Sequence, residues 1–271
     1  MSTAAPAKST VITLVFIHGW GMNSGVFSQL IDALRILDDE SESVSHVVFD
    51  YLCLDLPGHG AQHDIIPSPY ELSTLADSVG SQIPENSVLI GWSLGGLVAQ
   101  YLAVEQHPNV QALITIASTP KFQMADAWPG IKPEVLSMFT EQLSLNHHKT
   151  LSRFLAIQMM GVENAKALIK QISASIDALP TPHPSALAAG LEILQHADLR
   201  QDIGRIAVPT LRLYGRLDSL VPHSAINQIQ HLQPNSQTLI FKHASHAPFL
   251  TDAKVFAEHL RGFISAMLLN S

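Results

Sequence analysis

The chain has little of what secreted, membrane-bound and disulfide-stabilised proteins rely on. Its 271 residues include one cysteine, Cys53, which excludes an internal disulfide and suits a reducing cytoplasm. Long apolar runs are also missing: Val11–Ile17 is stopped by His18-Gly19, far short of the ~20 residues that span a bilayer. The first ten residues carry one Lys and no apolar run, so we expect no signal peptide and a cytoplasmic protein.

Positive charge is scarce as well. The chain has 15 Lys and Arg against 23 Asp and Glu, a formal net charge of −8. This excess of negative charge argues against nucleic acid as a general partner. The 46% hydrophobic and 14% charged content fits a compact globular enzyme with a large core. We therefore expect neither a nucleic acid nor a membrane partner, and a monomeric chain.

Apolar, β-branched runs alternate along the chain with segments of helical periodicity. Buried parallel strands form continuous apolar runs joined by helical crossovers, so the pattern predicts an α/β fold with a doubly wound, mostly parallel sheet. The strands are expected at Val11–Ile17, Val44–Leu54, Val88–Trp92, Ala112–Ala117, Thr210–Tyr214 and Thr238–Phe241. The helices are expected at Ser24–Leu37, Glu71–Ile83, Leu94–Gln106, Pro222–Leu232 and Asp252–Leu269.

The segment 118–185 interrupts this alternation. It has no convincing strand, and its helical stretches are punctuated by Trp128-Pro129-Gly130 and by a second proline-rich turn at 180–184. A helical insertion between late strands is most simply a cap over the active-site end of the sheet, because a separate domain of this length would have a small core. We assign 118–185 to a helical cap (lid), and 1–117 with 186–271 to the core.

The strongest local signal is Gly91-Trp92-Ser93-Leu94-Gly95, a G-x-S-x-G sequence. It follows the apolar run Val88–Ile90 and precedes a good helix pattern, which is the strand–turn–helix context of a nucleophile elbow. The helix that starts after Ser93 directs its amide groups at a developing oxyanion. We predict Ser93 as a nucleophile; the plainer interpretation is an ordinary Gly-Ser turn.

A serine nucleophile needs a base, and the base needs an orienting carboxylate. With this elbow the acid follows a late strand and the histidine follows the last one. Asp218 and His246 occupy these positions. Asp198 and Asp202 are weaker acid candidates because they precede their strand. His243 competes with His246, which we prefer because Ala-Pro-Phe then leads into the last helix.

The first strand is followed by His18-Gly19-Trp20-Gly21, whose glycines let the backbone approach the elbow. The Trp20 amide can then supply one oxyanion donor and the Leu94 amide the other. A plain Gly turn with a buried Trp is the simpler interpretation, and Trp20 could also wall the pocket. His243 and His246 lack a third ligand at useful spacing, so we predict no metal, and the triad chemistry needs no cofactor.

With these residues placed, the chain resembles the pimeloyl-[acyl-carrier protein] methyl ester esterases of biotin synthesis, a family with the α/β-hydrolase fold. The G-x-S-x-G and His-Gly motifs belong to the whole superfamily, whereas the stretches starting at Trp128 and Phe154 are far more telling. The matching stretches are His18–Gly21, Leu54–Gly58, Gly91–Ala99, Trp128–Pro133, Phe154–Gln158, Gly190–Leu194, Leu211–Gly215 and His246–Phe249.

The resemblance implies a catalytic triad of Ser93, Asp218 and His246, with Trp20 and Leu94 at the oxyanion. It also implies an acyl channel along five consecutive residues: Phe154, Leu155, Ala156, Ile157 and Gln158. Two departures from the family stand out. The Asp38–His46 loop is longer than expected, and the N-terminal hairpin that usually opens this fold looks short. Neither touches the catalytic residues.

Charge is distributed unevenly between cap and core. The segment 118–185 holds six Lys or Arg against five Asp or Glu, although the whole chain is strongly negative. Lys149 and Arg153, and Lys166 and Lys170, are spaced i,i+4, so each pair shares a helix face. A solvated surface is the plainer interpretation. The resemblance favours an acidic partner, because the family's basic residues that meet acyl-carrier protein lie at matching positions; three of the four here are Lys, which keeps charge but loses bidentate geometry.

The motifs predict a serine hydrolase, and the resemblance implies a carboxylesterase that releases methanol from pimeloyl-[acyl-carrier protein] methyl ester through an acyl-enzyme on Ser93. Activity is expected to fall on acidification as His246 gains a proton. Two alternatives remain: a general short-chain carboxylesterase or carbon–carbon hydrolase with the same triad, and a non-catalytic ligand receptor on the same scaffold. The complete triad counts against the receptor.

Overall fold

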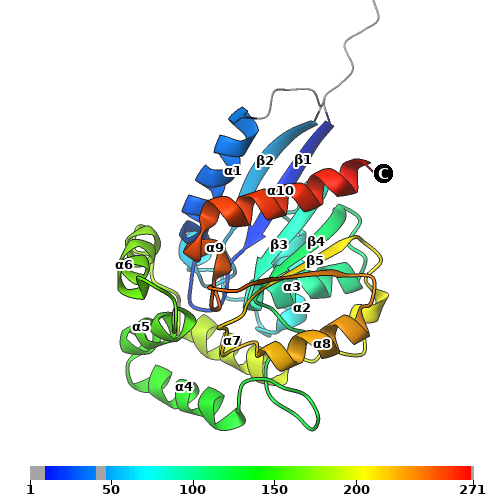
Figure 1. Ribbon diagram of the computed structural model, residues 1–271. Coiled ribbons are helices and arrows are strands. Elements are labelled where there is room, and N and C mark those ends of the chain that lie inside the picture. Colours follow the sequence, from blue (N-terminus) through cyan, green and yellow to red (C-terminus); the bar gives the residue numbers. More distant parts are fainter. Residues whose placement is uncertain (1–9, 41–46, 270–271) are drawn as a thin grey trace, which may run out of the picture.

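The computed structural model describes residues 10–40 and 47–269 (Figure 1). Its centre is a six-stranded sheet with strand order β2-β1-β3-β4-β5-β6, in which every neighbouring pair is parallel. The strands are β1 (Thr10–Ile17), β2 (Val47–Leu54), β3 (Ser87–Trp92), β4 (Val110–Ile116), β5 (Thr210–Gly215) and β6 (Gln237–Phe241). The predicted doubly wound parallel sheet is confirmed.

Helices cover both faces of the sheet, which explains why its central strands are continuous apolar runs. Every residue of β3 is buried, whereas β2 at the sheet edge alternates between half-buried and exposed positions until its last residues. One face packs against α1 (Ser28–Glu40) and α10 (Ala253–Leu269), which contact each other (Figure 1). The other packs against α2 (Leu72–Gly80), α3 (Leu94–Val104) and α8 (His223–Leu232).

Four helices lie between β4 and β5, at the carboxyl end of the sheet (Figure 1). They are α4 (Pro133–Leu145), α5 (His147–Gln158), α6 (Ala165–Ile176) and α7 (Pro184–His196). Proline occupies the first turn of both α4 and α7, where its missing N–H costs nothing. Between residues 118 and 183 the described β pairing consists of isolated bridges, without a strand. The division of cap from core at 118 and 185 stays a prediction.

The shorter elements are η1 (Ser24–Phe27), η2 (Gly60–Gln62), η3 (Ile203–Arg205) and α9 (Pro248–Thr251). Helix α7 lies mostly in a stretch for which the sequence patterns assigned no element. The expected start of the second strand at Val44, most of the long loop after Asp38, and the N-terminal residues before Thr10 lie outside the described residues. Within the described ranges, no helix is long and apolar enough to cross a membrane.

Candidate active site

Ser93 lies at a tight turn between β3 and α3. Its φ of 55° and ψ of −117° put it in the left-handed half of backbone space, which a residue with a Cβ rarely adopts. The turn closes only because its neighbours are small: a Cβ on Gly91 would lie 2.6 Å from the Cα of Gly96. The Ser93 amide donates to the Ile116 carbonyl at 2.9 Å, which ties the turn to β4. This is the geometry of a nucleophile elbow.

The structure brings three distant polar side chains into contact at this turn. His246 Nε2 lies 2.9 Å from Ser93 Oγ, and His246 Nδ1 lies 2.8 Å from Asp218 Oδ2. All three residues are buried: Ser93 is 3% exposed, His246 1% and Asp218 6%. When Nδ1 donates to the carboxylate, Nε2 is left with its lone pair facing the serine hydroxyl. The imidazole is therefore set to accept the Oγ proton.

The carboxylate of Asp218 is held by the backbone of its own loop. Its Oδ1 accepts from the amides of Leu220 at 2.8 Å and Val221 at 3.0 Å, so Oδ2 alone faces His246. These bonds also stabilise the turn leading into α8. The two interpretations of Asp218, turn-stabilising and catalytic, are thus compatible in one geometry.

Both main-chain polar groups of His246 are fixed as well. The Trp92 indole Nε1 donates to the His246 carbonyl at 2.8 Å, and the His246 amide donates to the Gln158 carbonyl at 3.2 Å. Sequence reasoning treated Trp92 only as the variable residue of the G-x-S-x-G motif. Trp92 and His246 are separated by 154 positions in the sequence, so no local signal predicts this contact.

Two backbone amides are available beside the nucleophile. A Cβ on Gly19 would lie 3.1 Å from the Ser93 Cβ, so the loop after β1 rests against the elbow. Within the described part of the chain, neither the Trp20 amide nor the Leu94 amide donates a hydrogen bond. Both amides are therefore free to act as donors, and the oxyanion role predicted for them stays a prediction.

His18 connects the loop after β1 to the loop after β2. The Leu56 amide donates to His18 Nε2 at 3.0 Å, so Nδ1 carries the proton and donates to the Gly19 carbonyl at 2.8 Å. Burial lowers the pKa of His18, which favours this neutral form. The neighbouring His59 ring lies 5.2 Å away, and burial, followed by the nearness of His18, lowers its pKa to about 3.

The weaker candidates for the triad lie elsewhere. Asp198 pairs with Arg200 and Lys121, and Asp202 with Arg205. His243 is exposed, whereas His246 is buried against the nucleophile. Among the described residues, no group of three or more His, Cys, Asp or Glu side chains is arranged to hold a metal ion.

The five residues expected along an acyl channel do not share one environment. Phe154, Leu155 and Gln158 are buried, Ile157 is half-buried, and Ala156 is exposed. Successive residues of an α-helix point about 100° apart, so five in a row cannot line one channel. The acyl channel stays a prediction, and of its five residues Ala156 is the one that faces solvent.

The buried side of α5 packs against the loop after β1 through aromatic rings. The Phe154 ring contacts the Trp20 ring edge-on at 4.8 Å, and the Trp20 indole donates to the Leu187 carbonyl of α7 at 2.8 Å. Gly190 on the same helix permits this approach, since a Cβ there would lie 2.7 Å from Trp20 Cδ1. Trp20 therefore joins the loop after β1 to two helices of the segment between β4 and β5.

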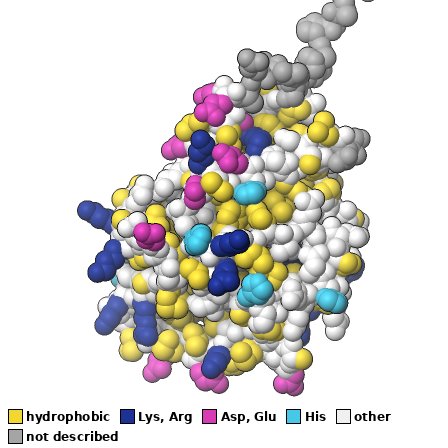
Figure 2. Space-filling model, in the orientation of Figure 1, with side chains coloured by type: hydrophobic (Ala, Val, Ile, Leu, Met, Phe, Trp, Pro, Cys, Tyr) yellow, Lys and Arg dark blue, Asp and Glu magenta, His cyan; other side chains and the backbone are white. Residues whose placement is uncertain are grey.

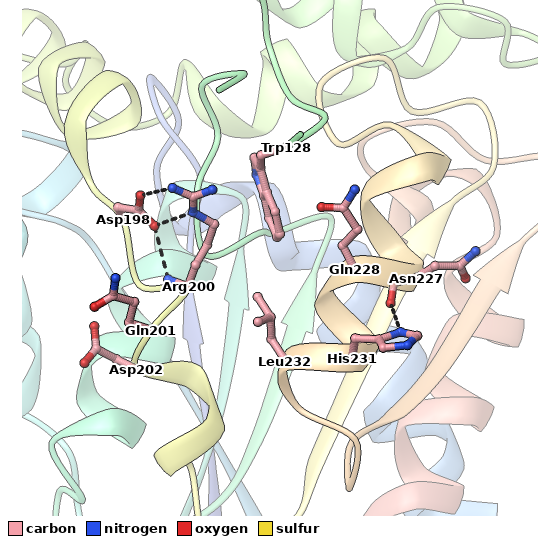
Figure 3. Close-up of a pocket in the computed structure, with 9 residues that line it drawn as sticks. All are labelled: Trp128, Asp198, Arg200, Gln201, Asp202, Asn227, Gln228, His231 and Leu232. Carbon is pink, nitrogen blue, oxygen red and sulfur yellow. Dashed lines mark hydrogen bonds and ion pairs between the residues drawn. The ribbon is translucent and has the colours of Figure 1, made fainter. Parts of the chain in front are cut away.

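At least two cavities border this segment. A cavity of about 180 Å³ separates the loop after β1 from α5 and α6, and its apolar lining includes Met22, Leu151, Leu155, Ile169 and Ile176. A more open cavity of about 930 Å³ lies between the 198–202 loop, Trp128 and α8 (Figure 3). There Arg200 stacks over the Trp128 ring and binds Asp198. None of the triad residues lines this second cavity.

The four cations singled out in the sequence lie on two neighbouring helices. Lys149 and Arg153 are exposed on α5, and Lys166 and Lys170 are exposed on α6. Figure 2 shows Lys and Arg side chains along the edge of the molecule where these helices lie. Arg153 donates to Gln142 on α4, and in the described residues none of the four has an ion-pair partner.

Comparison with known proteins gives the following matches. The family model for the alpha/beta hydrolase fold matches residues 12–253. A pimeloyl-[acyl-carrier protein] methyl ester esterase of Pseudoalteromonas atlantica is 47% identical over 89% of this chain and 90% of its own length. Proteins with the same description from Vibrio cholerae and Klebsiella pneumoniae are 41% and 42% identical, over 92% and 91% of this chain and 93% and 91% of theirs.

Solved structures share the fold at lower identity. An esterase from Exiguobacterium antarcticum superposes with a TM-score of 0.82 at 22% identity, covering 95% of this chain and 93% of its own. A bromoperoxidase from Bacillus anthracis gives a TM-score of 0.81 at 20% identity with the same coverage. Likeness at this level concerns the arrangement of helices and strands alone.

Proposed function

The chain belongs to the pimeloyl-[acyl-carrier protein] methyl ester esterases of the alpha/beta hydrolase fold. We propose that it hydrolyses the methyl ester of pimeloyl-[acyl-carrier protein] in biotin synthesis. It is a carboxylic ester hydrolase, and the fold expected from the sequence is confirmed. The observation that carries the proposal is the contact of Ser93, His246 and Asp218 beside two free backbone amides.

The first half of the reaction forms an acyl-enzyme. Ser93 Oγ attacks the carbonyl carbon of the methyl ester while His246 Nε2 takes the hydroxyl proton. The carbonyl π electrons move to oxygen, where the Trp20 and Leu94 amides stabilise the negative charge. When the tetrahedral intermediate collapses, the imidazolium gives its proton to the departing methoxy oxygen. Methanol leaves, and Asp218 stabilises the imidazolium without itself being protonated.

The second half repeats these steps with water. His246 Nε2 takes a proton from water as its oxygen attacks the acyl carbon, and the same two amides hold the second oxyanion. The imidazolium then returns a proton to Ser93 Oγ as the ester bond to the enzyme breaks. The products are the free carboxylic acid end of the pimeloyl group, methanol and the original enzyme. The proposed reaction uses no cofactor.

The cap supplies the rest of the proposed substrate site. We propose that the buried residues of α5, Phe154, Leu155 and Gln158, together with half-buried Ile157 and the 180 Å³ apolar cavity beside it, hold the acyl chain. Ser93 is only 3% exposed, so a substrate would reach it from this sheltered side of the molecule.

The proposed macromolecular partner is an acyl-carrier protein that docks on α5 and α6. Four exposed cations without ion-pair partners in the described chain, on a protein of net charge −8, favour an acidic surface opposite them. We propose further that the enzyme is a cytoplasmic monomer. The triad and both oxyanion amides come from one chain, and the single Cys53 can form no internal disulfide.

The test measures methanol release from carrier-linked pimeloyl methyl ester by the purified protein, alongside hydrolysis of p-nitrophenyl butyrate. Ser93→Ala abolishes both activities, and the wild-type gene restores growth of a biotin-requiring strain that lacks its own methyl esterase. Turnover of the aryl ester without any methanol from the carrier-linked ester would replace this proposal with a general short-chain carboxylesterase.

The docking surface has a test of its own. The double variant Lys149→Glu, Arg153→Glu is expected to raise KM for the carrier-linked ester roughly tenfold, since each exposed ion pair contributes up to about 1 kcal/mol. Its kcat/KM for the aryl ester stays within about twofold of wild type. Lys254→Glu, an exposed cation on α10, is the matched control and changes neither substrate. An equal effect of the double variant and the control would exclude α5 as the docking face.

A further inference from the structure

A buried arginine on β5 connects to the nucleophile elbow through three hydrogen bonds. Arg212 Nη1 donates to Gln100 Oε1 at 3.0 Å, and Gln100 Nε2 donates to Ser118 Oγ at 3.3 Å. Ser118 Oγ then donates to the Ser93 carbonyl at 2.8 Å. Arg212, Gln100 and Ser118 are each 0% exposed. This series of hydrogen bonds runs from β5 through α3 and the residues just after β4 to the turn at Ser93.

Each donor in this series points toward the elbow. A serine hydroxyl has one proton, and Ser118 uses it on the Ser93 carbonyl, so Gln100 must be the donor in the preceding bond. The other end of the Gln100 amide is then an acceptor, which only a donor such as Arg212 can satisfy. The direction of all three bonds is therefore set by their chemistry.

The last acceptor is part of the proposed oxyanion hole. The Ser93 carbonyl and the Leu94 N–H belong to the same peptide group, which is planar. A donor that fixes the carbonyl thus fixes the direction of the N–H on the opposite side. It also withdraws electron density from that N–H, because hydrogen bonds in series polarise one another.

The head of the series is a cation with no carboxylate beside it. Of the ion pairs found in the described residues, none includes Arg212. Its guanidinium binds the amide oxygens of Gln100 and Gln233, both neutral. An uncompensated buried charge is costly and is not needed to fill space, since an apolar residue of similar volume would suit a buried strand.

Close packing of α3 keeps the series in place. Gly96 lies under Ser118, and a Cβ there would be 2.7 Å from Ser118 Oγ. Gln100, one turn further along α3, also donates to the Gly96 carbonyl at 3.0 Å. The third glycine of Gly91-Trp92-Ser93-Leu94-Gly95-Gly96 therefore makes room for the hydroxyl that reaches the Ser93 carbonyl.

We propose that Arg212, Gln100 and Ser118 are positioning residues of the oxyanion hole: they orient and polarise the Ser93–Leu94 peptide so that the Leu94 amide binds the developing oxyanion more strongly. The proposal rests on the oxyanion role assigned to Leu94 under the proposed function. None of the three touches the substrate. Their effect belongs to the transition state, where the negative charge appears, and not to the bound ester.

The test compares Ser118→Ala, Gln100→Leu and Arg212→Met with the wild type on p-nitrophenyl butyrate. A trifluoromethyl ketone that forms a hemiketal with Ser93 is the transition-state analogue. Each variant is expected to lose roughly tenfold in kcat with KM within about twofold, less than the hundredfold or more lost with a direct oxyanion donor. The inhibition constant of the ketone rises by the same factor, and Arg212→Lys recovers part of the loss.

Thr115→Val is the matched control. Thr115 is buried on β4 directly beside Arg212 in register, and its hydroxyl has no hydrogen-bond partner. This variant is expected to keep kcat and the ketone inhibition constant of the wild type. If the three variants have lower melting temperatures but unchanged kcat and ketone inhibition, the series is only structural and the proposal is wrong.

The aryl ester needs no carrier protein, so the two proposals fail separately. Absence of activity on carrier-linked pimeloyl methyl ester overturns the proposed substrate and leaves this comparison unaffected. Unchanged ketone inhibition in Ser118→Ala, with the carrier-linked ester still hydrolysed by the wild type, overturns the positioning role alone.

Discussion

Replacing Gly95 by Ala would test how closely the end of β1 must approach the nucleophile elbow. Gly95 is the second residue of α3, and a Cβ there would lie well under 3.0 Å from the carbonyl oxygens of Ile17 and His18. Real Cβ atoms essentially never come so near another atom. Both neighbours are backbone atoms, which cannot rotate away as a side chain would.

The size of the effect follows from this overlap. Ordinary contact begins at 3.4 Å, so the end of β1 and the start of α3 must separate by about 1 Å. Trp20 sits on the segment that moves, and its amide then leaves the 2.7–3.1 Å range in which a donor stabilises an oxyanion. Loss of one such donor costs about 10²- to 10³-fold in kcat, or roughly 2.7–4 kcal/mol.

The assay follows kcat for p-nitrophenyl butyrate and the melting temperature of the same preparation. Gly262→Ala is the control, because Gly262 on α10 has no atom within 4 Å of its would-be Cβ. That variant should keep wild-type kcat and gain about 0.5–1 kcal/mol in stability from the better helix former. A folded Gly95→Ala protein with wild-type kcat would refute the claim that this close approach builds the oxyanion hole.

Three further outcomes are expected. Asp218→Asn lowers kcat about 10⁴-fold with little change in KM, because an amide cannot hold His246 in the required tautomer; retained kcat in steady-state assays would contradict this. Phe154→Ala, which removes the ring between Trp20 and Phe139, lowers the free energy of unfolding in urea by about 3–5 kcal/mol, and a loss below 1 kcal/mol would show that the site collapses. Burial in the folded chain lowers the pKa of His59 from 6.5 to about 3 and so keeps the imidazole neutral. The contribution of His59 to the stability of the folded state is therefore complete above pH 6.5 and is lost as pH falls toward 3. The loss reaches about 2 kcal/mol at pH 5, and His59→Gln should show correspondingly less acid destabilisation; equal pH dependence of the two proteins in urea would contradict it.

The elements that the sequence predicted well are those whose residues carry a local signal. Continuous apolar runs identify β1 and β3 because both faces of these strands are buried. Helix α7 carries no such apolar run, although it begins at a proline after a histidine whose side chain accepts a hydrogen bond from the Ser185 amide. Helix α7 packs against Trp20 on one side and against α4 on another, and these contacts are known only once α4 and the loop after β1 are placed.

Residues within a well-predicted element were also interpreted too simply. Arg212 was assigned only as one position of an apolar strand, whereas its guanidinium binds Gln100 and Gln233. Gln100 in turn connects it to Ser118. Ala156 was placed with its neighbours in a channel, but the turn of α5 points it to solvent. In both cases the helix or strand was predicted, but what a side chain meets depends on the elements that pack against it.

The sequence alone was enough to predict the order of the strands along the chain, the serine at a strand–helix turn, and an acid and a histidine after the last two strands. These follow from short stretches in which neighbouring residues constrain one another. The folded arrangement was needed to show that His246 meets a serine 153 residues away and that Trp92 and Gln158 hold that histidine. It was also needed to show that hydrogen bonds in series connect Arg212 to the Ser93 carbonyl. Such contacts form across the sheet and between layers, where distance along the chain carries no information about distance in space.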